Sequence, residues 1–452
     1  MRLANTAFRP PPGALSLLKF RQTSKVPVAR RTAQPAGDAA GRSEEDPSLP
    51  EPRLRESARG DKQSTASGPV RFPIRILTVG TAPTGPNSRG GMAAVTQLLI
   101  EDNDPRFHIR SVSTYVDDSL PVWLWTGISG MLKASALLLA GVVDVLHVHF
   151  SLRGSVVRKS LPLFVARMLG IPTIIHCHSS HFFTWFDGLP APLRRAVRAA
   201  LRADYVVLLG ESHMVASSAR LGFEVSKARL LYNPVVMPRD APPPRTRRPL
   251  SAVSLGRLGT NKGSYDLVRA IGLLPNDIRA DLRITLAGDG EVDQVREFVR
   301  AEALDDTIDV VGWVGPADRD RLLAESAIFV LPSYSEGLPM SVLEAMANGV
   351  VPVTTPVGAI PEVVTDGVNG LLVKPGEPAQ LAAALQALIV DTKLRDRLAA
   401  AAYARAGKFD VARWRDALHD VWLAAASQPR TVSPRWPFAG FRRSDAAILR
   451  RP

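Results

Sequence analysis

Residues 250–263 read LSAVSLGRLGTNKG, and their pattern indicates the fold class of the protein. Its first six residues are mostly apolar, which predicts a buried strand. A glycine-containing loop follows, and residues 263–274 then have the pattern of a helix. A strand, a glycine loop and a helix in this order form the repeating unit of doubly wound parallel sheets.

The same alternation recurs on both sides of this stretch. In the first half of the chain it predicts strands at 74–80, 143–148, 173–176 and 205–209, with a helix at 192–202. In the second half it predicts strands at 250–255, 282–287, 308–311, 327–331 and 350–354, a helix at 291–303, and further helices within 378–424. The fold class is therefore α/β, with two doubly wound, Rossmann-like domains.

Composition sets the expected boundaries. Residues 1–70, rich in Pro, Ser, Arg and Gly, form a disordered basic leader; 71–238 form the first domain, 239–250 a proline-rich linker, 251–427 the second domain and 428–452 a flexible basic tail. The first 37 residues contain basic but no acidic residues, as an organellar transit peptide does. A disordered leader or a mis-assigned start is the interpretation we prefer.

The charge narrows the classes of function. The 452 residues carry a net charge of +13, and the excess lies in the first half and the tail, because 241–427 contain more acidic than basic residues. The basic residues do not gather with aromatics in one module, so we expect no nucleic-acid partner. The single cysteine, Cys177, excludes an intrachain disulfide and fits a reducing compartment. The most apolar stretch, 121–140, is interrupted by Lys133, so no membrane span is expected.

Two motifs carry chemistry. In the loop 256–263, Arg257 and Lys262 add two cations to the amides at a helix N-terminus, which suits a diphosphate. In SYSEGLPMSVLEAMA, residues 333–347, Glu336 ends a loop and Glu344 lies two turns into the next helix. Carboxylates can bind pairs of sugar hydroxyls. Alternatively, the cations are exposed turn residues, and the glutamates favour the helix dipole or face solvent.

The segment 331–375 resembles the retaining glycosyltransferases of family 4, which have the GT-B fold, two Rossmann-like domains that face a central cleft. The resemblance rests on Glu336 and Glu344 as the family's E-x7-E, on ANGVVPV at 347–353, PEVV at 361–364 and DGVNG at 366–370. The loop 256–263 and AGDG at 287–290 occur in the family's order. The match covers 250–425 closely and 74–240 more weakly.

The resemblance implies a donor site for a nucleoside-diphosphate sugar. Arg257 and Lys262 would hold the diphosphate, Glu344 the ribose hydroxyls and Glu336 the transferred sugar. Gly337 and Leu338 would belong to the phosphate-binding backbone.

In the first domain, the resemblance places Gly91, in the loop 88–92, near the donor phosphates and the acceptor. It places His178 beside the anomeric carbon, where the carbonyl or ring can stabilise the oxocarbenium charge. His147 and His149 would line the floor of the site or be core residues. We expect no metal and no cofactor, because no carboxylate or second cysteine completes a histidine ligand set. The strings Asp102-Asn103-Asp104 and Asp318-Arg319-Asp320 do not follow buried strands.

Residues 193–202 predict a basic amphipathic helix with four arginines, preceded by the aromatic stretch 182–186, which we expect to be exposed or to line an acceptor groove. A solvated helix and a helix on an anionic membrane are both compatible with this pattern.

The expected function is transfer of a sugar to a saccharide or lipid-linked acceptor in cell-surface polysaccharide or glycolipid biosynthesis. The expected location is the cytoplasm, with reversible binding to the cytoplasmic face of the inner membrane. The alternatives are a nucleotide-sugar epimerase or hydrolase and a non-catalytic nucleotide-sugar-binding protein.

Overall fold

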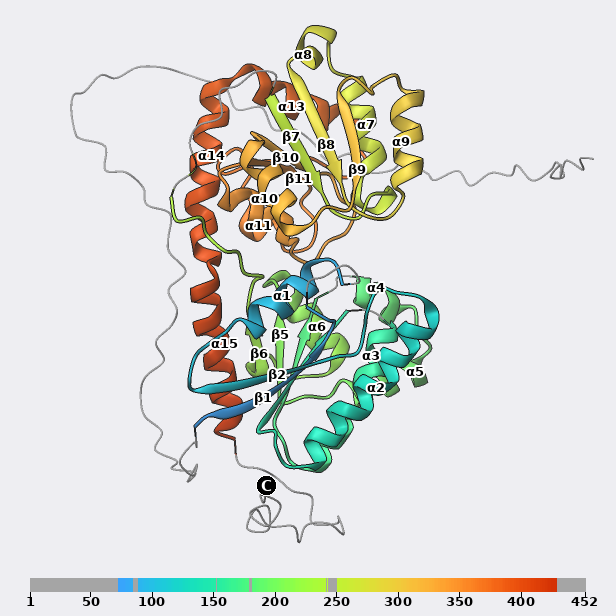
Figure 1. Cartoon of the computed structure of the whole chain (residues 1–452), viewed down its shortest axis with the longest axis vertical. Helices are drawn as coiled ribbons and strands as arrows, with labels where there is room; N and C mark the ends of the chain where they lie inside the picture. Colours follow the sequence, from blue (N-terminus) through green and yellow to red (C-terminus); the bar gives the residue numbers. More distant parts are fainter. Residues whose placement is uncertain are drawn as a thin grey trace, which may run out of the picture. The chain divides into compact units, whose positions relative to one another are not determined.

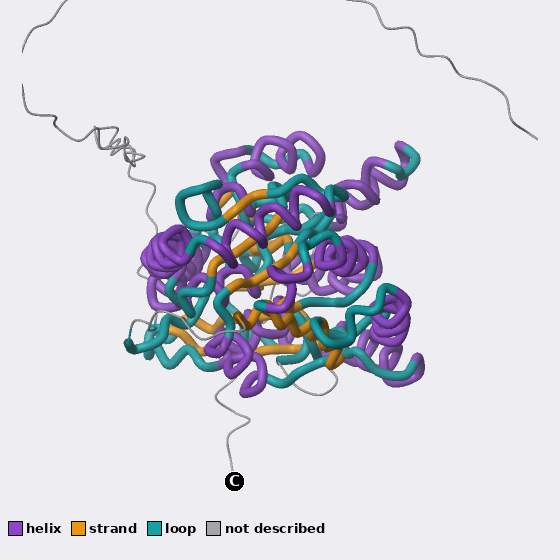
Figure 2. The backbone as a smooth tube through the Cα atoms, turned by 90° about the horizontal axis from the view of Figure 1, so that it is seen from above, coloured by secondary structure: helices purple, strands orange, loops and turns teal. Residues whose placement is uncertain are grey.

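A computed structural model describes residues 72–83, 88–151, 153–178, 181–240, 242 and 250–428. The expected leader lies outside these residues. The same holds for the expected tail apart from Gln428, and for most of the expected linker. Seen from above, the strands lie inside and the helices lie around them (Figure 2).

The first sheet is parallel and has six strands in the order β2-β1-β3-β4-β5-β6. The strands are β1 (Ile74–Gly80), β2 (Phe107–Ser113), β3 (Val145–Phe150), β4 (Thr173–Cys177), β5 (Tyr205–Leu208) and β6 (Ala228–Leu230). The helices between them are α1 (Gly91–Ile100), α2 (Leu120–Leu139), α3 (Arg153–Met168), α4 (His181–Asp187), α5 (Ala191–Ala200), α6 (Ser212–Leu221) and η1 (Val225–Lys227).

Side chains that alternate along the strands build two cores on the two faces of this sheet. Leu77 and Val79 of β1 join the core that includes residues of α2 and α3. Ile74 and Ile76 join the opposite core, with residues of α1. This alternation follows from the two-residue period of a strand, and it covers both faces with helices, as a parallel sheet requires.

The second sheet is also parallel, in the order β12-β11-β10-β7-β8-β9. Its strands are β7 (Leu250–Leu255), β8 (Leu282–Ala287), β9 (Ile308–Gly312), β10 (Ile328–Leu331), β11 (Val351–Thr354) and β12 (Leu371–Leu372). The helices are η2 (Thr260–Lys262), α7 (Ser264–Gly272), α8 (Asn276–Ala280), α9 (Val292–Ala301), α10 (Pro316–Glu325), α11 (Met340–Ala347), α12 (Ile360–Val363), α13 (Pro378–Val390), α14 (Thr392–Ala406), η3 (Gly407–Phe409) and α15 (Val411–Ala426). The expectation of two Rossmann-like domains is confirmed.

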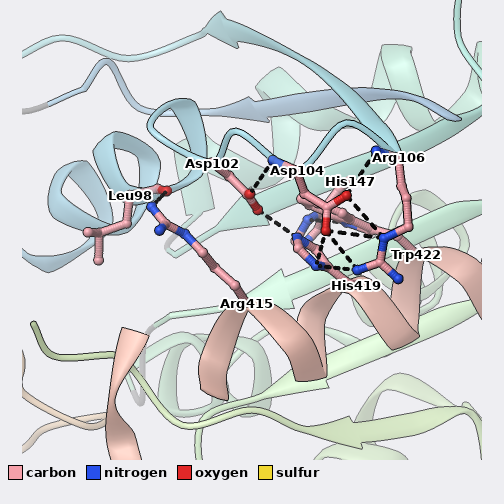
Figure 3. Close-up of polar contacts among 8 residues, drawn as sticks. All are labelled: Leu98, Asp102, Asp104, Arg106, His147, Arg415, His419 and Trp422. Carbon is pink, nitrogen blue, oxygen red and sulfur yellow. Dashed lines mark hydrogen bonds and ion pairs between the residues drawn. The ribbon is translucent and has the colours of Figure 1, made fainter. Parts of the chain in front are cut away.

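The last helix, α15, packs on the first sheet, although its residues fall in the range expected for the second domain (Figure 1). Trp414, Leu418 and Trp422 join the core of β1 and α1. Polar contacts reinforce this packing: His419 Nε2 lies 2.6 Å from Asp102 Oδ2, and Arg415 donates to the carbonyl of Leu98 at 3.0 Å (Figure 3).

Helix α2 is the one described helix that is long and apolar enough, by length and composition, to cross a membrane, and only 28% of its apolar stretch is buried. The expectation of exposed aromatics in 182–186 is wrong for Phe182 and Phe186. Both are fully buried in the first domain, because α4 turns them toward the core that α3 covers.

Candidate active site

The loop after β7 carries the two predicted cations. Arg257 is 70% exposed and lies 3.4 Å from Asp289, so its guanidinium is largely open to solvent. Lys262 ends η2, and Gly263 follows with φ +70°. A Cβ at Gly263 would collide with the carbonyl oxygen of Pro332. The tight passage of this loop beside Pro332 therefore requires glycine.

Lys262 meets the predicted sugar-binding Glu336 directly. Its Nζ lies 2.5 Å from Oε1 of Glu336, which is buried. The hydroxyl of Ser333 donates to the same oxygen at 2.7 Å. A buried carboxylate needs such partners. Sequence reasoning missed Ser333, although its place two residues after β10 and three residues before Glu336 is a local signal.

The backbone after Glu336 is fixed from two sides. Leu338 is buried, and its carbonyl accepts a hydrogen bond from Asn233 Nδ2 at 2.7 Å. A Cβ on Gly337 would lie 3.3 Å from the carbonyl oxygen of His178. The structure thus brings the predicted Gly337 and His178 together from different sheets. Sequence reasoning missed Asn233, because it lies outside every recognised motif.

His178 follows β4 and donates its N–H to the carbonyl of Phe150 at 3.0 Å. Its Nε2 lies 2.9 Å from Nδ1 of His149. Burial lowers the pKa of His178 to about 3, so the ring is neutral near pH 7. A neutral ring and a carbonyl oxygen beside Gly337 are compatible with stabilising positive charge on a nearby carbon.

Behind His178 lie three fully buried histidines, His147, His149 and His176. One ring nitrogen of each falls within 4.8 Å of the others. Burial lowers the pKa of all three, that of His147 to about 3. Trp422 donates to His147 Nδ1 at 3.3 Å, whereas both ring nitrogens of His176 have no hydrogen-bond partner. The group contains no carboxylate, and our expectation that no metal takes part in the reaction stands as a prediction.

Glu344 lies in the second turn of α11, 16% exposed. Burial raises the pKa of Glu344, and Arg319, which donates to Glu344 Oε1 at 2.8 Å, offsets only part of this rise. Arg319 is a residue that sequence reasoning missed, since it was considered only within an acidic string. In the structure Asp320 pairs with Arg319 and Asp318 with Arg321.

Gly91 begins α1, and a Cβ there would lie 3.5 Å from Met340 Cγ, at the start of α11. In the same loop the guanidinium of Arg89 lies 4.8 Å from the ring centroid of Trp313. The predicted Gly91 and Gly337 therefore both lie beside elements of the other sheet.

Glu362 of α12, in the second domain, forms hydrogen bonds to residues of the first domain. It accepts hydrogen bonds from the backbone N–H groups of Glu211 and Ser212, at 2.8 and 3.0 Å, and from the hydroxyl of Tyr232 at 2.9 Å. Despite partial burial, the hydrogen bonds from Ser212 and the other donors lower the pKa of Glu362. An ionised Glu362 thus fixes the loop after β5 against α12.

Comparison with known proteins supports this architecture. Residues 241–405 match the family model described as Glycosyl transferases group 1. The D-inositol 3-phosphate glycosyltransferase of Frankia alni is 31% identical over 325 residues, 65% of this chain and 77% of that protein. The glycogen synthase of Mycobacterium tuberculosis is 28% identical over 317 residues, 65% of this chain and 72% of that protein.

Solved structures share the fold. Sucrose-phosphate synthase from Thermosynechococcus elongatus superposes with a TM-score of 0.60 at 18% identity, over 78% of this chain and 100% of that one. Anabaena HepE in complex with UDP-glucose gives 0.57 at 17% identity, over 78% and 100%. The fold and the similarity to these relatives together show that the protein is a glycosyltransferase of the GT-B fold. The chain belongs to the glycosyl transferases group 1 family.

Proposed function

We propose that this enzyme transfers a sugar, with retention of configuration, from a nucleoside-diphosphate sugar to a saccharide or lipid-linked acceptor, as a family 4 glycosyltransferase. The observation that carries the proposal is the contact of Lys262 with Glu336, next to the approach of Gly337 to the His178 carbonyl. It joins a cation, a carboxylate, loop amides and a carbonyl, the groups that a diphosphate and a sugar ring need.

In the proposed reaction, Lys262 and Arg257 neutralise the diphosphate, and Glu344 binds the ribose hydroxyls. The bond from the anomeric carbon to the phosphate oxygen breaks as the acceptor oxygen forms its bond on the same face. The leaving phosphate takes the acceptor proton. Glu336 holds the sugar, and the His178 carbonyl stabilises the developing positive charge.

The donor is supported by the solved Anabaena HepE complexes, which contain UDP and UDP-glucose. No metal or other cofactor is proposed, because Arg257 and Lys262 supply the positive charge that a divalent cation would supply elsewhere. A place in cell-surface polysaccharide or glycolipid synthesis, at the cytoplasmic face of the inner membrane, fits the basic first domain.

A donor screen followed by acceptor assays tests the proposal. We expect UDP and one nucleoside-diphosphate sugar to raise the melting temperature, and transfer to need an acceptor but not to be abolished by EDTA. NMR of the product should show the anomeric configuration of the donor. Rapid donor turnover without acceptor would favour an epimerase or hydrolase instead, and unchanged activity of Glu336→Gln in cells would favour a non-catalytic role.

A further inference from the structure

Helices α2 and α3 expose apolar side chains in two stripes. Trp125, Ile128 and Leu132 of α2 are all at least half exposed, with Trp125 at 72%. Their spacing of three and four residues places them on one face of the helix. On α3 the exposed apolar residues Val157, Leu161 and Phe164 have the same spacing. Exposed apolar residues that gather along one face of a helix are typical of a site of interaction.

Both stripes belong to one layer of the domain. The connections β2 to β3 and β3 to β4 run in the same direction along the sheet, so right-handed crossovers place α2 and α3 on the same face. The two helices pack side by side, and α5 lies next to α3 (Figure 1). We call the exposed residues of α2 and α3 named above the α2–α3 apolar surface.

Helix α2 is held on the domain by its opposite face. The buried residues of that face include Gly127, Gly130 and Ala134. A Cβ on Gly130 would collide with the carbonyl oxygen of Ser113 at the end of β2. Such a close approach keeps α2 on the domain while its outer stripe stays open, so the helix is suited to lie on a membrane rather than to cross it.

The helices α2, α3 and α5 carry an excess of basic residues. The sequences of α2, α3 and α5 contain no aspartate or glutamate. Their basic residues with solvent-accessible side chains are Lys133, Arg158, Arg167, Arg194, Arg195 and Arg198, whereas Lys159 is buried. Helices of the second domain differ, since α9 and α10 both contain acidic residues.

We propose that the α2–α3 apolar surface binds an anionic lipid bilayer, with its apolar side chains among the acyl chains and the exposed Arg195 of α5 at the headgroups. A second copy of the chain is the poorer occupant, because a symmetric contact would bring the same cationic layer against itself. The role of this surface rests on the proposed function. An enzyme bound to the membrane through it would meet a lipid-linked acceptor in the same membrane.

Vesicle flotation of the full chain tests the surface. We expect binding to vesicles that contain phosphatidylglycerol and little binding to phosphatidylcholine vesicles, because anionic lipid attracts basic residues. The variant Trp125→Glu/Ile128→Glu should bind about tenfold more weakly or worse, since both substitutions put charge into the acyl region. The control Leu273→Glu/Val390→Glu changes equally exposed apolar residues of the second domain and should bind as the wild type does.

A site-specific probe sharpens the test. The native cysteine, Cys177, is buried, so a maleimide dye should label only an introduced cysteine. An environment-sensitive dye at Ile128→Cys should shift its emission to the blue with phosphatidylglycerol vesicles, and the same dye at Leu273→Cys should not. Equal responses at the two positions, or none at Ile128→Cys, would overturn the proposal.

Two further readouts separate the explanations. The UDP-induced rise in melting temperature should be the same in the charged variant and the wild type, which shows that the fold and donor site are intact. If the wild type is a dimer without lipid and the charged variant a monomer, the occupant is a second copy and the proposal is wrong. Vesicle binding without transfer to any saccharide or lipid-linked acceptor would support the membrane-binding surface and contradict the proposed function.

Discussion

Lys262 Nζ and Glu336 Oε1 lie 2.5 Å apart although 74 residues separate them in the sequence. The lysine comes from the loop after β7 and the glutamate from the loop after β10, and these two strands pair in the sheet. This ion pair therefore places the lysine that we propose to bind the diphosphate next to the glutamate that we propose to bind the sugar.

Glu336→Gln should lower kcat by about a hundredfold, because the neutral amide cannot replace a carboxylate that holds the reacting sugar. The melting temperature should change little, since Ser333 can still donate to the amide oxygen. Initial rates at saturating donor measure the effect. Glu291→Gln, which alters a carboxylate bonded to Tyr265, is the matched control and should keep the wild-type kcat.

Arg319→Ala should raise KM for the donor about tenfold, the loss of roughly one charged hydrogen bond. Without Arg319, burial and the charge of Asp320 both still raise the pKa of Glu344, so this pKa rises further and the carboxylate is protonated at a higher pH. The variant's donor affinity should consequently weaken as the pH falls through a range in which the wild type is unaffected. Titration of the donor at several pH values checks this. Arg321→Ala, on the same helix and paired with Asp318, should not shift the pH dependence.

The buried histidines should make the protein acid-sensitive. Burial lowers their folded pKa values, to about 3 for His147 and His178, whereas an unfolded histidine titrates near pH ~6.5. The unfolded state therefore binds more protons between these values, and stability falls as the pH drops below ~6.5. Each histidine contributes at most about 1.4 kcal/mol per pH unit.

Replacing His176 by Leu should flatten this dependence and leave the melting temperature near pH 7 unchanged or higher, because its ring nitrogens have no partners to lose. Thermal melts between pH 7 and 5 measure the slope. The exposed His108 of β2 provides the control, and His108→Leu should keep the wild-type slope. A slope unaffected by His176→Leu would contradict the assignment.

Gly263→Ala should destabilise the protein by about 1–3 kcal/mol and reduce transfer, because alanine is strained at φ +70° and meets the Pro332 carbonyl. Urea unfolding and initial rates measure the two effects. Gly315→Ala is the control, as that glycine has a negative φ and open space around it. Equal losses in both variants would remove the special role of the loop.

Local patterns predicted much of the fold. The bounds of β1, β7 and β8 coincide with those expected, because each is a largely buried run with apolar residues that ends near a glycine. Strand β2 was not predicted, since Phe107–Ser113 is an edge strand whose exposed positions carry polar residues. The aromatic residues of α4 were misplaced because a short apolar run does not reveal which side the core covers.

The site was only partly predictable. The motifs identified Glu336 and Glu344 but not their partners Ser333 and Arg319, which depend on side-chain directions that spacing does not specify. The Asn233 contact with Leu338 joins residues 105 positions apart and has no local signal. The packing of α15 on the first sheet could not be predicted either, because an amphipathic pattern does not indicate which element the apolar face of the helix contacts.

The position of α15 has a consequence for biosynthesis. Trp422 is fully buried in the core that contains Ile74 of β1. His419 contacts Asp102, which lies 317 residues earlier in the sequence. The first domain therefore cannot complete its core on the ribosome until almost the whole chain has emerged. Until then its apolar face is open, and chaperone binding to nascent chains that end before residue 411 should be stronger than to the finished protein.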